Sequence, residues 1–315
     1  MAKSQCDQTT IQSLIQLATP VLIQTQKEYD AMTKEEKKKK RGRKFQIPDW
    51  VIALLIMIVL LKKKKTKTAQ FTYLSENRSW IEPLLQGEAM PKRTAYFDRY
   101  RKAYEFLQKA IHVQGLLAVS EGIVDPSEMA VDKSLIPSRG PLWHAKDREN
   151  NMIPQGLHGV DVESEWGYSK HDGWVQGYCY EVVVSAAYGT VVFPMIASAD
   201  AANAKETKTF VEKIDLLHER TRFVCADAGY DSNEIGEKIE WHANEAKRTG
   251  CRFLGVQRKA PKTSKKKREK RKTEPRQTAK QKQIFRTSPC PSKVFGDIWR
   301  SEGLRPSRKN GRTVQ

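Results

Sequence analysis

The spacing of hydrophobic residues divides the chain into a helical first part and a strand-rich second part. Residues 1–45 are polar and end in a basic run, a pattern typical of a solvated helix or tail. Residues 46–125 have helical spacing, and Pro48 suits the start of a helix over the eleven apolar residues Val51–Leu61. Because a membrane-spanning helix needs about 20 apolar residues, this run predicts a buried helix. A further helix is expected to open within Met90–Arg101, with its proline in the first turn.

Short apolar runs typical of strands begin after the turn signal Asp125-Pro126. The expected strands are Met129–Ile136, Trp174–Ala187, Thr190–Ser198, Arg222–Asp227 and Cys251–Gln257. The second and third of these are expected to pair as an antiparallel hairpin. The expected helices are Ala204–Glu219 and Ser232–Lys247. Trp166–Trp174 is expected to be a loop that either packs its tryptophans on the sheet edge or touches DNA. This order of elements predicts an α/β domain with a mixed sheet.

The chain is strongly basic, with 56 Lys and Arg residues against 37 Asp and Glu residues and a formal net charge of +19. Such an excess attracts polyanions, which leaves DNA, RNA and an acidic membrane surface as possible partners. Residues 258–282 contain thirteen Lys or Arg residues and two Glu residues. This segment cannot bury enough apolar surface to fold by itself. It is expected to be a disordered loop that binds phosphate backbones without reading sequence.

Five scattered cysteines form no C-x-x-C pair, which argues against both a disulfide scaffold and a zinc ribbon. A reducing cytoplasm is the simplest setting for such a set. The first 20 residues also lack the basic start and apolar run of a secretory signal. These features favour a cytoplasmic protein.

Two acidic residues lie at strand positions where a carboxylate is costly. Asp132 lies inside the apolar stretch MAVDKSLI, and Asp227 closes the stretch RFVCAD. A carboxylate in or beside a core needs a partner or a bound cation. Two such acids on neighbouring strands would form a hard oxygen site for Mg²⁺ or Mn²⁺. For either acid alone, a strand-end residue that makes local hydrogen bonds is the alternative.

Several stretches, in order, resemble the core of DDE-type transposases of bacterial insertion sequences. They are AVDKSLIPSRG, WGYSKHDGWVQGY, VVFPMIASADAANAKET and FVCADAGYDS, and the resemblance covers residues 90–257. In that family the first catalytic Asp lies on the first strand and the second lies in a D-x-G-Y-D motif. The resemblance therefore assigns Asp132 and Asp227 as catalytic metal ligands.

The resemblance also implies a fold and an activity. The fold is a ribonuclease-H-like mixed sheet flanked by helices and preceded by an all-helical N-terminal domain. The activity is metal-dependent DNA strand cleavage and strand transfer at insertion-sequence ends, with two Mg²⁺ or Mn²⁺ ions. The implied partner is double-stranded DNA, namely terminal inverted repeats and target DNA. A homodimer in the synaptic complex, a nucleoid-associated location and no membrane contact follow from the same resemblance.

Five segments are expected along the chain. They are a polar tail or helix (1–45), a helical DNA-binding-type domain (46–125), the catalytic core (126–257), the polybasic loop (258–282) and an irregular tail (283–315). The expected DNA contacts are Lys92, Arg93, Arg99, Lys265, Lys266, Lys267 and Arg268. The first three lie on a helix whose mixture of Arg and Tyr equally suits an ordinary amphipathic helix.

The third carboxylate of the family pattern is not evident. The family places a Glu four residues after an Arg on a late helix, but Arg286 is followed at that spacing by Cys290, between two prolines. The late glutamates Glu274 and Glu302 lie on no convincing helix. We therefore expect a reading frame disturbed after Arg286. This leaves an active transposase and an inactive, truncated relic that only binds DNA as alternatives, with a membrane-surface protein as a weaker third.

Overall fold

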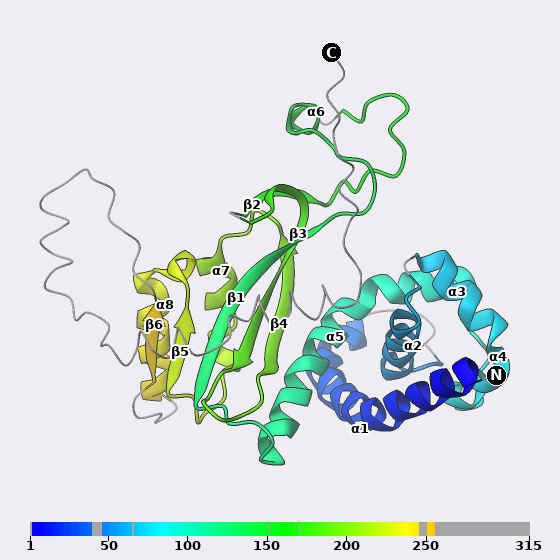
Figure 1. The fold of residues 1–315 in the computed structure, drawn as a ribbon, viewed down its shortest axis with the longest axis horizontal. Coiled ribbons are helices and arrows are strands. Elements are labelled where there is room, and N and C mark those ends of the chain that lie inside the picture. The colour runs from blue at the N-terminus through cyan, green and yellow to red at the C-terminus, as the bar shows by residue number, and fades with distance from the viewer. Residues whose placement is uncertain are drawn as a thin grey trace, which may run out of the picture. The chain divides into compact units, whose positions relative to one another are not determined.

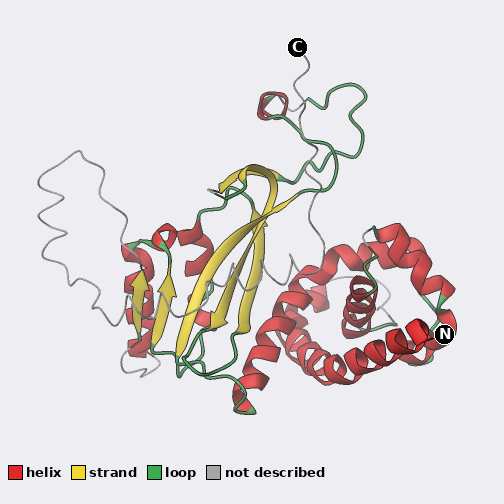
Figure 2. Ribbon diagram, in the orientation of Figure 1, coloured by secondary structure: helices red, strands yellow, loops and turns green. Residues whose placement is uncertain are grey.

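The computed structural model describes residues 2–39, 46–64, 66–150, 152–169, 171–245 and 251–255. The chain divides after Glu121 into two compact units. We call them the helical unit (residues 1–121) and the sheet unit (residues 122–315), and their secondary structures are distinct in Figure 2. The polybasic loop and all candidates for the third carboxylate lie outside the described residues.

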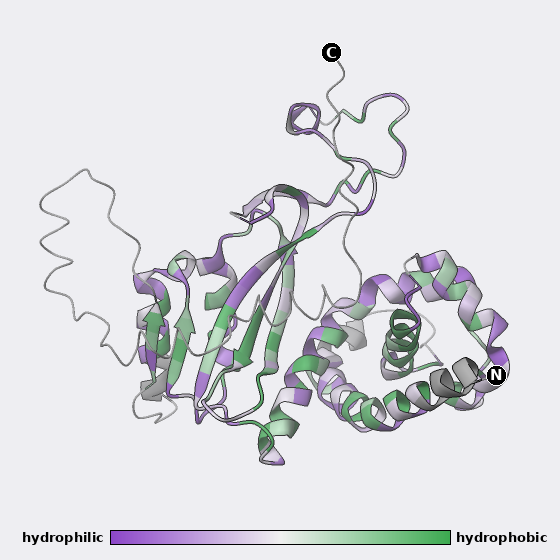
Figure 3. Cartoon of the chain, viewed as in Figure 1, coloured by the Kyte–Doolittle hydropathy of each residue, from purple (hydrophilic) through white to green (hydrophobic). Residues whose placement is uncertain are grey.

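The helical unit is built around one short apolar helix. Its elements are α1 (Ala2–Lys39), α2 (Asp49–Leu61), α3 (Lys67–Glu76), α4 (Arg78–Ile81), the 3₁₀ turn η1 (Glu82–Leu85) and α5 (Arg93–Ser120). Helix α2 contacts α1, α3 and α5 (Figure 1). The hydropathy colouring of Figure 3 shows that α2 is hydrophobic along its length, whereas the longer helices mix polar and apolar residues.

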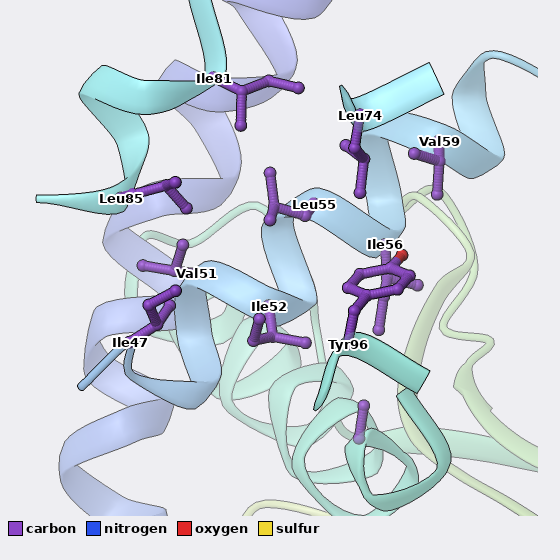
Figure 4. Packing of buried hydrophobic residues seen from close by; sticks show 11 residues of the cluster. Ile47, Val51, Ile52, Leu55, Ile56, Val59, Leu74, Ile81, Leu85 and Tyr96 are labelled. Atoms are coloured by element: carbon purple, nitrogen blue, oxygen red, sulfur yellow. The ribbon is translucent and has the colours of Figure 1, made fainter. Parts of the chain in front are cut away.

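Helix α2 confirms the predicted buried helix. Val51, Ile52 and Leu55 are at most 1% exposed, and they pack against Leu74 of α3 and Tyr96 of α5 (Figure 4). A helix that is apolar on every side is stable when other helices surround it. No helix among the described residues is long and apolar enough to cross a membrane.

Two helices differ from expectation, α1 in its burial and α5 in its first residue. The polar N-terminal segment forms α1, and its residues Ile11 and Leu22 are buried in a cluster with residues of α2 and α5. This helix is therefore packed on one side and not merely solvated. Helix α5 begins at Arg93, after Lys92 in extended conformation, so Pro91 precedes the helix instead of lying in its first turn.

The sheet unit has a mixed sheet with ribonuclease-H-like topology, as predicted. Its strands are β1 (Glu128–Pro137), β2 (Glu165–Ser169), β3 (Gly173–Ser185), β4 (Phe193–Ala201), β5 (Phe223–Ala226) and β6 (Arg252–Gly255). Strand β1 is antiparallel to β3 and parallel to β5, which in turn is parallel to β6. Strands β2 and β4 are both antiparallel to β3: β2 pairs with its first half and β4 pairs with its second half. The long strands β1 and β3 are therefore central to the sheet (Figure 1).

The helical segments of the sheet unit are short. They are α6 (Ala145–Glu149), α7 (Glu206–Val211), η2 (Ile214–Leu216), η3 (Ala228–Tyr230) and α8 (Asn233–Glu245). Helices α7 and α8 contact each other and lie behind the sheet in Figure 1. The single helix expected over Ala204–Glu219 is wrong. After Phe210 its backbone hydrogen bonds join residues three apart, as in Lys213 N to Phe210 O (2.9 Å), so the segment tightens into 3₁₀ turns.

The expected loop Trp166–Trp174 is instead the hairpin of β2 with the start of β3. The strand was missed because it is short and contains Gly167. A Cβ on this glycine would lie 2.5 Å from the Ala202 carbonyl oxygen, so the close approach of the two backbones requires glycine. The Trp166 indole donates to the Trp143 carbonyl (2.9 Å), which ties the hairpin to the preceding segment.

Candidate active site

The pairing of β1 with β5 places the two candidate aspartates side by side. Val131 of β1 is paired with Ala226 of β5 in parallel register. The next residue of β1 is Asp132, and the residue that directly follows the end of β5 is Asp227. Since neighbouring strands lie about 4.8 Å apart, the backbones of the two aspartates are adjacent at the carboxyl end of β5. Two aspartates that lie far apart in the sequence are therefore neighbours in the fold.

The strands that lead to the two aspartates share an apolar face. Side chains alternate along a strand, so Asp132 of β1 lies on the same face as Ala130, whereas Asp227 follows the end of β5 and turns its side chain toward the Gly229 N–H. Ala130 and Cys225 lie together in one apolar cluster. Tyr180 of β3 packs against this cluster, and burial raises the pKa of its phenol, opposed by a hydrogen bond with Ser134 and supported by the charge of Asp132.

Local hydrogen bonds orient both carboxylates. Asp132 Oδ1 accepts from the backbone N–H of Lys133 at 2.8 Å. Asp227 Oδ1 accepts from the backbone N–H of Gly229 at 2.7 Å, which caps the η3 turn. Asp132 is half-buried and Asp227 is exposed. The pair therefore combines fixed backbone positions with access to solvent on the Asp227 side.

A lysine and a glutamate lie next to the aspartate pair. Lys133 Nζ donates to the Ala204 carbonyl at 2.5 Å and lies 3.9 Å from Glu206 Oε1. A Cβ on Gly229 would overlap Glu206 Oε2 and would lie 2.9 Å from Asp227 Oδ1. The Glu206 carboxylate therefore reaches the turn that carries Asp227, and this contact depends on the glycine of the D-x-G-Y-D motif.

A buried polar network lies on the α7 side of the sheet. We call it the Glu181 network: Glu181, Thr209, Lys213 and Tyr230. The Glu181 carboxylate accepts hydrogen bonds from Lys213 Nζ (2.6 Å), Thr209 Oγ1 (2.8 Å) and Tyr230 Oη (3.0 Å). All four residues are at most 6% exposed. Sequence reasoning missed this network, although an acid inside the apolar stretch YEVVV was a visible signal.

The donor atoms of the aspartate pair fit a hard divalent cation. Carboxylate oxygens are the ligands that Mg²⁺ and Mn²⁺ prefer. Asp132 and Asp227 are the residues that would hold such cations. Within the described part of the chain, no set of three acidic, histidine or cysteine side chains could hold a metal ion. Glu274 and Glu302 lie outside that part.

The candidate DNA-contacting residues have different environments. Lys92 and Arg93 are exposed at the start of α5, and Arg93 donates to Thr68 Oγ1 at 3.2 Å and lies over the Phe97 ring. Arg99 is 7% exposed, and its guanidinium donates to Asp49 Oδ1 (2.5 Å) and to the Ile47 carbonyl. Its charge is thus engaged inside the helical unit. Lys265, Lys266, Lys267 and Arg268 lie outside the described residues.

Comparison with known proteins agrees with this geometry. A family model for the transposase DDE domain matches residues 121–295, more than half of the chain. Curated proteins and solved structures give no match. The matched segment contains both aspartates and the whole described sheet. The chain therefore belongs to the DDE-domain transposases.

Proposed function

We propose that this transposase cleaves DNA strands at the ends of an insertion sequence and joins the freed 3′ ends to target DNA. The observation that carries the proposal is the parallel register of β1 and β5, which pairs Val131 with Ala226, the residues that directly precede Asp132 and Asp227. Divalent cations, when bound, supply the positive charge that activates a water or 3′ hydroxyl and stabilises the leaving oxygen. The two aspartates would hold two Mg²⁺ or Mn²⁺ ions.

Other residues of the site have supporting roles in this proposal. Lys133 offsets part of the negative charge of Glu206, whose carboxylate reaches the turn that carries Asp227. The backbone N–H of Gly229 holds one oxygen of Asp227. A third ligand would come from outside the described residues, with Glu302 as the candidate from the sequence.

DNA binding in this proposal uses the exposed basic residues of the helical unit. Lys92 and Arg93 are exposed at the start of α5, and the ammonium of exposed Lys67 on α3 lies 5.9 Å from the ring centre of Tyr100 of the same α5 helix. Arg93 is held over Phe97 and by Thr68, which directs its charge without neutralising it. Such residues would contact phosphates, and they give no base-reading signature. The polybasic residues 258–282 would add to this contact.

A cleavage assay tests the proposal. The full chain is incubated with Mg²⁺ or Mn²⁺ and labelled duplexes taken from the DNA on each side of its coding sequence. We expect metal-dependent nicking that Asp132→Ala and Asp227→Ala each abolish. Nicking that survives both substitutions would refute the site.

DNA binding without cleavage is the second candidate function. It is favoured by the lack of a third metal-ligating side chain among the described residues. In that case the unsubstituted chain binds the same duplexes in a salt-sensitive manner and cuts none of them. Homodimer formation on paired ends belongs to the first function and is tested by the mass of the protein–DNA complex.

A further inference from the structure

We propose that Tyr230 is a positioning residue that, through the Glu181 network, sets the position of Asp227 relative to Asp132. This inference rests on the proposed role of the two aspartates in holding a divalent cation. It concerns residues that touch neither the cation nor DNA. The network joins the turn that carries one aspartate to the strand beside the other.

The network spans the two segments that carry the aspartates. Tyr230 ends the η3 turn, which Asp227 caps. Glu181 lies on β3 directly opposite Lys133 of β1, the residue that follows Asp132. The hydrogen bond from Tyr230 Oη to Glu181 Oε2 (3.0 Å) therefore links the Asp227 turn to the centre of the sheet at the level of Asp132.

The interactions inside the η3 turn transmit this position to the carboxylate. The Tyr230 N–H donates to the Asp227 carbonyl at 3.3 Å, and the Gly229 N–H donates to Asp227 Oδ1 at 2.7 Å. The Tyr230 ring is also fixed, because it packs edge-to-face on Phe210 with 5.8 Å between ring centres. Movement of the phenol would therefore move a turn whose backbone holds the Asp227 side chain.

Burial of the charged groups of the network costs stability. This cost favours a role in which the network fixes the orientation of its side chains. Glu181 and Lys213 are 2% and 6% exposed, and burial of such an ion pair is often no better for stability than apolar residues of similar size. Apolar packing has no preferred direction, whereas hydrogen bonds to a carboxylate fix an angle and a distance. Lys213 and Thr209 hold the Glu181 carboxylate so that Oε2 faces Tyr230.

The Tyr230 phenol donates its hydrogen bond to Glu181 from a buried position. Burial, followed by the charge of Glu181 and the hydrogen bond to it, raises the pKa of the Tyr230 phenol far above its ordinary value. A protonated phenol beside an ionised carboxylate forms a charge-assisted hydrogen bond. Removal of this single oxygen is therefore the smallest change that breaks the hydrogen bond between the turn and β3.

The test is Mn²⁺ affinity of the full chain, measured by water-proton relaxation. Tyr230→Phe should weaken Mn²⁺ binding about tenfold, the scale known for residues that orient metal ligands. Tyr178→Phe is the matched control, because Tyr178 also donates to a carboxylate, Asp161, at 2.9 Å, but outside the network. The control should bind Mn²⁺ as the unsubstituted chain does.

A pair of double variants separates positioning from stability. Glu181→Gln with Lys213→Met removes both charges but keeps an acceptor for Tyr230, and it should retain Mn²⁺ affinity within about threefold. Glu181→Leu with Lys213→Met removes the acceptor and should weaken binding about tenfold, as Tyr230→Phe does. Adding Tyr230→Phe to the Leu and Met variant should cause no further loss, because the hydrogen bond is already absent.

Asp132→Ala and Asp227→Ala supply the reference. If both bind Mn²⁺ as the unsubstituted chain does, or if that chain does not bind, the proposed metal site is wrong and this inference fails with it. If both aspartate variants lose Mn²⁺ while Tyr230→Phe and the Leu and Met variant bind normally, only the positioning role is overturned. Circular dichroism of each variant identifies any that does not fold, and the remaining variant of the network then decides the result.

Discussion

The buried side chains around α2 and those beneath α7 differ in polarity. In the helical unit, α2 buries eight residues, and none of them is polar. In the sheet unit, the space between the sheet and α7 contains an acid, a base and two hydroxyl groups. The contrast is between the packing around α2, which buries only apolar side chains of that helix, and the α7 side of the sheet, which buries an ion pair near the turn that carries Asp227.

The largest effect should come from breaking the buried ion pair. Lys213→Met leaves the Glu181 carboxylate buried and without its cation, which is expected to cost about 3–5 kcal/mol. Hydrogen exchange of peptides from β3 should accelerate, whereas peptides from α2 should not change. Lys238→Met is a matched control, because Lys238 pairs with the exposed Asp215 at 3.0 Å. Equal effects of the two substitutions would contradict the comparison.

A cavity in the helical unit should have the reverse pattern. Leu55 is fully buried, and Leu55→Ala removes apolar contacts and leaves a cavity that costs about 2–5 kcal/mol. Exchange should accelerate in α2 and remain unchanged in β3. Leu60 of the same helix is 51% exposed, so Leu60→Ala is the control and should have a much smaller effect. Coupled loss of both units would mean that they do not unfold separately.

The contrast also explains which parts of the structure the sequence could predict. The α2 helix and the strands β1, β3 and β5 were predictable, because runs rich in apolar residues indicate burial directly. The pattern drew attention to Asp132 and Asp227, because a charged residue interrupts or ends such a run, and the family resemblance supplied their expected role. These signals lie within single segments of the chain.

The missed features depend on contacts between distant segments. The Glu181 network joins residues as far as 49 positions apart, and no local pattern pairs Glu181 with Tyr230. Strand β2 was missed because the reason for its glycine lies in a distant segment: the backbone at Ala202 leaves no room for a Cβ at Gly167. Arg99 looked like a surface cation because its partner Asp49 lies 50 positions earlier in the sequence.

Arg99 is a buried charge in the helical unit, so its replacement measures how much a buried ion pair contributes to the stability of that unit. Arg99→Met removes the bonds to Asp49 and to the Ile47 carbonyl and should cost about 1.5–3 kcal/mol, the range for hydrogen bonds to charged groups. Arg101 is the control on the same helix, since its pair with Asp98 is exposed and 3.7 Å long. Chemical denaturation of both variants, followed by circular dichroism at the helix signal, measures the difference. Similar stability of both would show that the Arg99 bonds contribute nothing.

The smallest effect on stability should accompany a clear effect on DNA binding. Lys92→Gln and Arg93→Gln change exposed side chains, so the free energy of unfolding should shift by no more than about 0.5 kcal/mol. If each residue contacts a phosphate, each substitution should lower the slope of log affinity against log salt by about one. Fluorescence anisotropy with a labelled duplex at several salt concentrations measures that slope.

Arg78→Gln is the control for this measurement, because Glu82 already offsets the charge of Arg78 at 2.6 Å. Its slope should equal that of the unsubstituted chain. Arg93 should have a larger effect on affinity than Lys92, because Thr68 and Phe97 hold its guanidinium in place and less side-chain entropy is lost on binding. An unchanged slope for both variants would move DNA contact away from the start of α5. The DNA-binding surface would then consist of basic residues other than Lys92 and Arg93.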